Sequence, residues 1–69
     1  MKLENLRILR RPEVEKITGL KRSSIYAKMA EKTFPLTIKI GSRSVGWLES
    51  EIHEWLEKRI SESREVSND

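Results

Sequence analysis

The sequence predicts a small α+β domain, and three observations carry this prediction. Two short segments with helical spacing, residues 12–18 and 24–32, are separated by a glycine-containing turn. Apolar residues then follow a period of two through residues 36–47, with a polar turn in the middle, as in a β-hairpin. A final helical stripe occupies residues 48–60. We therefore expect three helices and a short hairpin in one domain over residues 1–60.

Charge is distributed unevenly along the chain. The 69 residues carry a formal net charge of +3. Residues 1–48 contain 11 Lys and Arg against 4 Glu, a charge of +7, whereas residues 49–69 contain 3 against 7 Asp and Glu, a charge of −4. A basic body with an acidic end can present a positive surface to phosphate groups. This asymmetry favours a nucleic-acid partner over a uniformly solvated surface.

The composition argues against catalysis and metal binding. The chain has no cysteine and a single histidine, His53, which lies in a glutamate-rich helical segment. A lone exposed histidine is a poor candidate for a catalytic base or metal ligand. Gly41 and Gly46 flank a hairpin turn and form no phosphate-binding loop. We expect no enzyme activity, no metal and no cofactor.

No stretch of the sequence reads as a signal peptide or membrane span, so we expect a cytoplasmic protein that does not contact membranes. Met1 to Asn5 is expected to be frayed. Leu6 to Leu9 suits an edge strand, and Pro12 suits the first turn of a helix. Arg10 and Arg11 lie between these elements, either as solubilising charges or as contacts to a phosphate.

The first helix and its turn are predicted by spacing. Val14 and Ile17 lie three residues apart on one helical face. Gly19 can take the left-handed conformation that ends a helix, and Leu20 is expected to be buried inside the turn. The pattern indicates a short scaffold helix followed by a tight turn.

The second helix is expected to begin after Ser23, a plausible N-cap. Ile25 and Met29 are four apart and are expected to face the first helix, while the outer face is basic and aromatic. Two short helices in this arrangement are typical of a helix-turn-helix.

The hairpin is predicted over residues 36–47. Leu36, Ile38 and Ile40 are expected to make one face of a half-buried strand, and the turn 41–44 carries Arg43 at its tip. In the second strand of the hairpin, Val45 and Trp47 are expected to lie on one face. A helix-turn-helix followed by a basic hairpin is winged-helix organisation.

The last helix is predicted from one apolar stripe, formed by Leu48, Ile52, Trp55, Leu56 and Ile60. Phe34 and both tryptophans, Trp47 and Trp55, are expected in the core. Residues 61–69 contain little apolar surface and are expected to form a disordered acidic tail.

The candidate contacts to double-stranded DNA come from two projections. A helix fits the major groove and presents its N-terminal side chains to base edges, while an arginine-tipped hairpin follows the backbone or enters a minor groove. The candidates are Lys21, Arg22, Ser23, Ser24, Tyr26 and Lys28 on the second helix and Lys39, Ser42, Arg43 and Ser44 on the wing, with Arg10 and Arg11 as further phosphate contacts.

Several motifs together resemble the AlpA family of phage and prophage regulators. They are Arg7-Ile8-Leu9-Arg10, Pro12-Glu13-Val14, Thr18-Gly19-Leu20, Arg22-Ser23-Ser24-Ile25-Tyr26, Phe34-Pro35, the run from Lys39 to Trp47, and the run from Glu51 to Leu56. The resemblance covers about residues 6 to 60 in unbroken order. It implies a MerR-like winged helix-turn-helix, related to phage excisionases, that regulates transcription of a bacterial mobile element. Ala27 departs from the arginine common at this position in the family.

We therefore expect a sequence-specific DNA-binding regulator of a phage, prophage or other mobile element, located at the bacterial nucleoid. Two alternatives stay open: an excisionase-like factor that bends DNA for a recombinase, and a protein-interaction module that uses the acidic last helix. We also expect copies of the chain to associate on DNA. No small-molecule ligand is expected.

Overall fold

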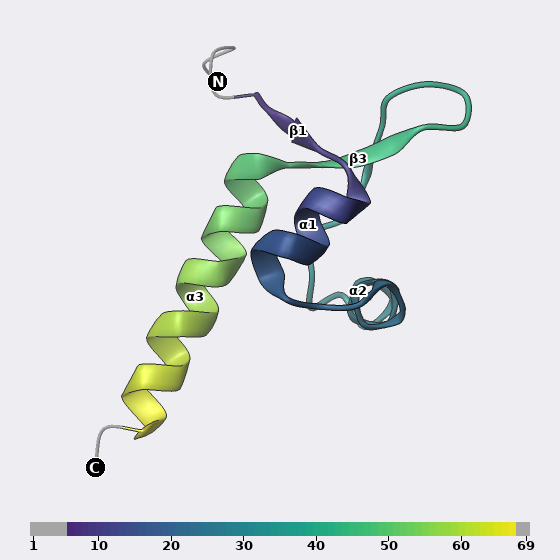
Figure 1. Ribbon diagram of the computed structural model, residues 1–69. Helices are drawn as coiled ribbons and strands as arrows, with labels where there is room; N and C mark the ends of the chain where they lie inside the picture. Colours follow the sequence, from purple (N-terminus) through teal and green to yellow (C-terminus); the bar gives the residue numbers. More distant parts are fainter. Residues whose placement is uncertain (1–5, 68–69) are drawn as a thin grey trace.

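The computed structural model describes residues 6–67, with side chains described through Arg64. Three helices and three short strands follow one another along the chain (Figure 1). They are β1 (Ile8–Leu9), α1 (Arg11–Thr18), α2 (Arg22–Ala30), β2 (Ile38–Lys39), β3 (Val45–Leu48) and α3 (Glu49–Ser67). The architecture is the predicted α+β winged helix-turn-helix. The expected fraying of Met1 to Asn5 concerns residues outside the described part.

The strands form one antiparallel sheet in the order β1-β3-β2. Ile8 pairs with Leu48 in β3, and Ile38 of β2 pairs with Gly46. A Cβ atom at Gly46 would lie 2.5 Å from Cγ2 of Ile8 and 3.0 Å from Cδ1 of Ile40, so these side chains close over the glycine. The sheet thus joins the N-terminal segment to the wing, with β1 at one edge as predicted.

The turn between α1 and α2 has the predicted geometry. Gly19 takes a φ of 77°, and its N–H donates to the carbonyl of Glu15 at 2.8 Å. The Thr18 hydroxyl donates to the carbonyl of Val14 and accepts from the N–H of Leu20, at 2.8 Å and 3.2 Å. Leu20 is half-buried against the core. The turn is therefore fixed at both its backbone and its side chains.

The predicted cap of α2 is wrong. Helix α2 begins at Arg22, and its N-cap is Lys21, whose backbone is extended (φ −87°, ψ 163°) and which makes no side-chain capping bond. Ser23 lies within the first turn of the helix, because the chain becomes helical two residues earlier than the serine pattern indicated. Helix α2 ends at Ala30, slightly before the expected residue 31 or 32.

The core lies where α1, α2 and α3 meet the inner face of the sheet. Its buried side chains are Leu9, Val14, Ile25, Phe34, Trp47 and Ile52. Both indoles also bind the connector between α2 and β2: Nε1 of Trp47 donates to the carbonyl of Pro35 at 3.0 Å, and Nε1 of Trp55 to that of Thr33 at 2.7 Å. Trp47 and Phe34 are core residues as predicted, whereas Trp55 is half-buried.

Some apolar residues that were expected to be buried are exposed. Leu36 is 62% exposed and Ile40 50%, and only Ile38 and Lys39 of this segment form strand β2. The prediction of a half-buried strand is wrong because β2 is a short edge strand that no helix covers. Ile17 on α1 is also exposed, at 38%, although Val14 on the same helix is fully buried.

Helix α3 is longer than the sequence predicted. It continues to Ser67, so residues 61–67 are helical rather than irregular, and the helix extends away from the body of the domain (Figure 1). Every side chain from Glu57 to Arg64 is exposed, including Ile60, which was expected to extend the apolar stripe. The two last residues, 68 and 69, lie outside the described part.

Among the described helices, none is long and apolar enough to cross a membrane.

Candidate nucleic-acid interface

The first half of α2 exposes a basic and aromatic surface. Lys21, Arg22 and Ser23 are exposed, and Ser24 is half-buried. The Arg22 guanidinium lies 5.9 Å from the centroid of the Tyr26 ring, one turn further along, and Tyr26 itself is 39% exposed. Arg22 and Tyr26 therefore form one stacked unit at the end of the helix expected to read bases.

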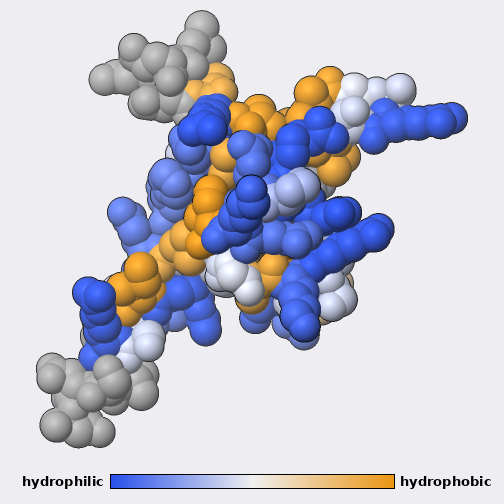
Figure 2. Space-filling model, viewed as in Figure 1, coloured by the Kyte–Doolittle hydropathy of each residue, from blue (hydrophilic) through white to orange (hydrophobic). Residues whose placement is uncertain are grey.

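The wing is a compact turn with a cation at its tip. The N–H groups of Ile40 and Gly41 both donate to the carbonyl of Ser44, at 2.8 Å and 3.2 Å. These bonds leave Ser42 and Arg43 exposed at the tip, and Ser44 half-buried. The loop projects from the sheet beyond the helices (Figure 1), and hydrophilic side chains extend from this region in Figure 2.

A shallow depression of about 260 Å³ lies between the wing, α2 and the start of α1. The residues that line it are Arg10, Arg11, Pro12, Tyr26, Arg43, Val45 and Trp47. Arg10 and Arg11 are far from Arg43 in the sequence, and the pairing of β1 with β3 brings them together. The structure thus brings one α2 candidate, Tyr26, and one wing candidate, Arg43, together with Arg10 and Arg11.

The charges around this depression, which we call the arginine depression, favour an anion. None of its lining residues is acidic, although three guanidinium groups border it. Nε of Arg11 is paired with Glu15 at 2.9 Å, and this pair is partly exposed. Glu13, by contrast, accepts a hydrogen bond from the backbone N–H of Arg10. This bond does not involve the guanidinium of Arg10, whose side chain is exposed. Guanidinium groups bind phosphate oxygens in pairs of parallel hydrogen bonds, so the depression suits a phosphate.

Not every predicted residue reaches this place. Of the predicted residues, only Tyr26, Arg43, Arg10 and Arg11 line the depression. The candidates that do not line it are Lys21, Arg22, Ser23, Ser24, Lys28, Lys39, Ser42 and Ser44. Lys28 is half-buried toward the end of α2, and Lys39 is exposed on β2. Sequence reasoning missed Val45 and Trp47 as walls of the site. The signal was present, because Val45 and Trp47 alternate along one face of β3 and Arg43 lies two residues before Val45.

In the described part of the chain, no group of three or more His, Cys, Asp or Glu side chains could hold a metal ion.

The helix-turn-helix followed by a hairpin wing places the chain in the winged helix-turn-helix class. Residues 7–60 match the family model described as prophage CP4-57 regulatory protein (AlpA). The chain belongs to the AlpA family of prophage regulatory proteins.

Two relatives illustrate the membership. The chain is 45% identical over 60 residues to the DNA-binding transcriptional activator AlpA of Escherichia coli K12, a match that covers 78% of this chain and 86% of the relative. It is 42% identical over 55 residues to the uncharacterized protein ORF88 of Enterobacteria phage P4, covering 80% of this chain. The match spans 62% of the length of the phage protein.

Proposed function

We propose that this chain binds duplex DNA with sequence specificity and regulates transcription of a phage, prophage or other mobile element at the bacterial nucleoid. The single observation that carries the proposal is the convergence of Arg10, Arg11 and Arg43 around Tyr26. Three cations gathered from separate elements, with no acidic residue lining the depression between them, fit a backbone phosphate.

In this proposal the two projections have different tasks. Arg22 and Tyr26 lie in the first turns of α2, the part of a recognition helix that contacts base edges in the major groove. The wing and the start of α1 together hold a backbone phosphate beside that helix, which fixes its position without reading sequence. Ser23, Ser24 and Ser42 add hydroxyl donors to phosphate at the same surface.

The family relationship supports this function, since the E. coli relative is named as a DNA-binding transcriptional activator. A regulator of this kind needs no catalytic group and no cofactor. We propose that adjacent copies bind the same duplex, as helix-turn-helix proteins do on repeated half-sites.

The proposal is tested by selecting bound duplexes from a random pool and measuring affinity for the selected sequence and a scrambled one at several salt concentrations. We expect tight, salt-dependent binding to the selected duplex and weaker binding to the scrambled one. Equal affinity for both duplexes would contradict sequence specificity.

A matched pair of arginine variants locates the interface. Arg43→Ala should reduce the salt slope by about one unit, because one phosphate contact is lost. Arg64→Ala removes an equal charge from an exposed position far along α3 and should leave the slope unchanged. The interface would be misplaced if both variants had the same effect.

A further inference from the structure

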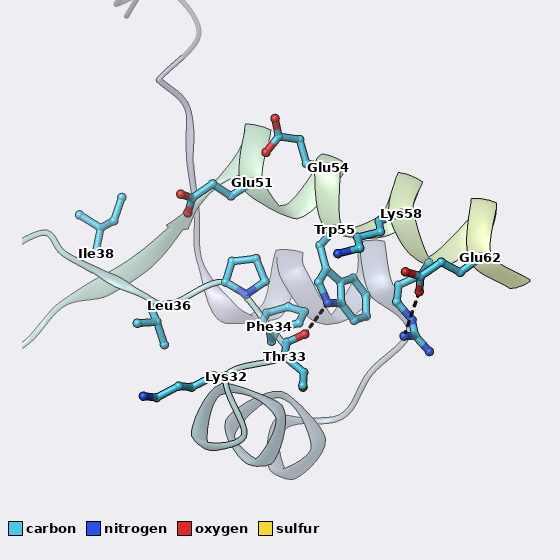
Figure 3. A pocket seen from close by; sticks show the side chains of 12 residues that line it. Lys32, Thr33, Phe34, Leu36, Ile38, Glu51, Glu54, Trp55, Lys58 and Glu62 are labelled. Atoms are coloured by element: carbon cyan, nitrogen blue, oxygen red, sulfur yellow. Dashed lines mark hydrogen bonds and ion pairs between the residues drawn. The ribbon is translucent and has the colours of Figure 1, made fainter.

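A groove of about 850 Å³ lies on another part of the molecule, between α3 and the segment that connects α2 to β2 (Figure 3). It shares no lining residue with the arginine depression. Its apolar surface comes from Phe34, Pro35, Leu36, Ile38 and Trp55, and charged side chains of α3 border it. The proposed function leaves this groove without a role.

The apolar part of the groove is exposed to solvent at Leu36 and Ile38. Leu36 is the most exposed large apolar side chain of the described residues, at 62%, and Ile38 is 37% exposed. Phe34 and Trp55 make an edge-to-face contact with centroids 4.8 Å apart, which forms a rigid base. Clustered apolar side chains of this kind mark an interaction surface when charged residues border them.

The outer part of α3 lacks support from the rest of the domain. All side chains from Glu57 to Arg64 are exposed, yet the helix continues to Ser67. In proteins most helical stability comes from packing of one face rather than from helix propensity. The extension therefore fits a helix that gains a packing partner outside its own chain.

Of the charged α3 residues that line the groove, the four nearest Trp55 have opposite signs on its two sides. Glu51 and Glu54 lie on the N-terminal side of Trp55, and Lys58 and Arg59 lie on its C-terminal side. Arg59 stacks over the Trp55 ring at 5.9 Å, and its pair with Glu62 is exposed and long, at 3.8 Å. If a second α3 lies antiparallel to the first, with the two Trp55 residues facing each other, the acidic and basic pairs of the two helices come together. Glu51 and Glu54 of each helix then lie beside Lys58 and Arg59 of the other.

We propose that this groove binds α3 of a second copy of the chain, so that two antiparallel α3 helices form a symmetric dimer. The two-fold arrangement makes the surface complementary to itself in charge. Leu36 and Ile38 of each copy then cover the partner's helix, and Trp55 lies at the centre. The proposal does not depend on DNA binding, because the groove and the arginine depression are separate.

Charge reversal tests the dimer directly. The variant Glu51→Lys/Glu54→Lys makes the groove-facing stripe basic, and Lys58→Glu/Arg59→Glu makes it acidic. The parent chain should associate as its concentration rises in sedimentation equilibrium without DNA. Each variant alone should associate more than about tenfold more weakly, because like charges then meet at four places.

Mixing the two variants separates intermolecular pairing from effects within one helix. An equimolar mixture should form a one-to-one heterodimer in native mass spectrometry, since every facing pair is then attractive. Circular dichroism of each variant checks that its helices remain. A mixture that associates no better than its components would overturn the proposal, and so would a parent chain that stays monomeric at all concentrations.

A second pair of variants addresses the apolar surface. Leu36→Ser should weaken association while leaving the unfolding temperature of the dilute monomer nearly unchanged, because Leu36 is mostly exposed. Ile17→Ser, an exposed apolar residue of α1 outside the groove, serves as the control and should not affect association. Equal effects of both variants would contradict the assigned surface. A parent chain that stays monomeric yet binds duplex DNA would overturn this inference and leave the proposed function standing.

Discussion

The ring of Tyr26, exposed on the outer face of α2, lies 6.4 Å from the ring of the fully buried Trp47, with the two planes tilted by 56°. This separation is within the range of favourable aromatic pairs. Tyr26 therefore belongs to the candidate DNA surface and to the packing that positions it.

Tyr26 variants should separate these two roles. Tyr26→Ala should lower the free energy of unfolding by about 1 kcal/mol, because the ring contact is lost. Tyr26→Phe keeps the ring and should change stability by less than about 0.5 kcal/mol. Both should weaken binding to the selected duplex, as measured by fluorescence anisotropy. If Tyr26→Ala is as stable as the parent chain, the contact with Trp47 contributes nothing to the fold.

Arg22 and Arg43 should differ in what they contribute to binding. Arg22→Ala should reduce affinity for the selected duplex more than for a scrambled one, because a good base contact is worth about 1 to 3 kcal/mol of discrimination. Arg43→Ala should weaken both duplexes by similar factors. Titrations of the two variants against both duplexes measure the contrast. The assignment is wrong if Arg43→Ala alone abolishes discrimination while Arg22→Ala retains it.

Trp55 should stabilise the fold through its ring and its N–H separately. Trp55→Phe removes the hydrogen bond to Thr33 and should cost about 1 kcal/mol. Trp55→Ala also removes the contact with Phe34 and should cost about 3 kcal/mol. Urea unfolding of dilute protein, where self-association is minimal, gives both values. A Trp55→Ala variant that folds normally but loses DNA binding would place Trp55 at the DNA surface instead.

Lys32 offers a stabilising substitution. It is the one non-glycine residue with positive φ (64°) among the residues described, and it follows the end of α2. The N–H of Lys32 donates to the carbonyl of Met29, and that of Thr33 to the carbonyl of Lys28, the pattern of a Schellman motif. Glycine is favoured at this position, so Lys32→Gly should raise the free energy of unfolding by about 0.5 to 1 kcal/mol. Glu31→Gly, at a φ of −80°, is the control and should give no gain in thermal melts.

Deleting residues 61–69 should leave the unfolding temperature nearly unchanged. Although α3 continues through this segment, the side chains described for residues 61–64 are all exposed and belong to no core cluster. The deletion removes three acidic residues and one arginine, so DNA affinity should stay equal or rise slightly. Thermal melts and duplex titrations measure both effects. Collapse of the fold would show that the domain extends beyond residue 60.

Local patterns predicted the order and type of the elements well. Gly19 and Leu20 indicated the turn, and the alternation through Val45 and Trp47 indicated the returning strand, because each signal depends on neighbouring residues. The predicted N-cap of α2 was wrong because the backbone becomes helical at Arg22. Ser23 therefore lies inside the helix and cannot cap it. The end of α2 lies within two residues of the predicted residue 31 or 32, although a lysine takes the place usually held by glycine.

Long-range arrangement was harder to predict. Leu36 and Ile40 have the spacing of a buried strand face, but burial requires a covering element, and spacing does not reveal whether one exists. The arginine depression depends on the pairing of β1 with β3, and nothing local to Arg10 indicates that Arg43 lies nearby. Each cation could be suggested as a DNA contact, whereas their convergence required the fold.

The strand order has a consequence for how the chain folds as it is synthesised. Arg7 and Glu49, which pair at 3.1 Å, are 42 residues apart, and β1 and β2 both pair with β3 and not with each other. Until β3 is synthesised, α1 and α2 are complete in the chain, but neither edge strand has its central strand. The helix-turn-helix therefore has no sheet behind it in a chain that ends before β3. A nascent chain that stops before Val45 contains most of the DNA-facing side chains yet cannot hold them in place.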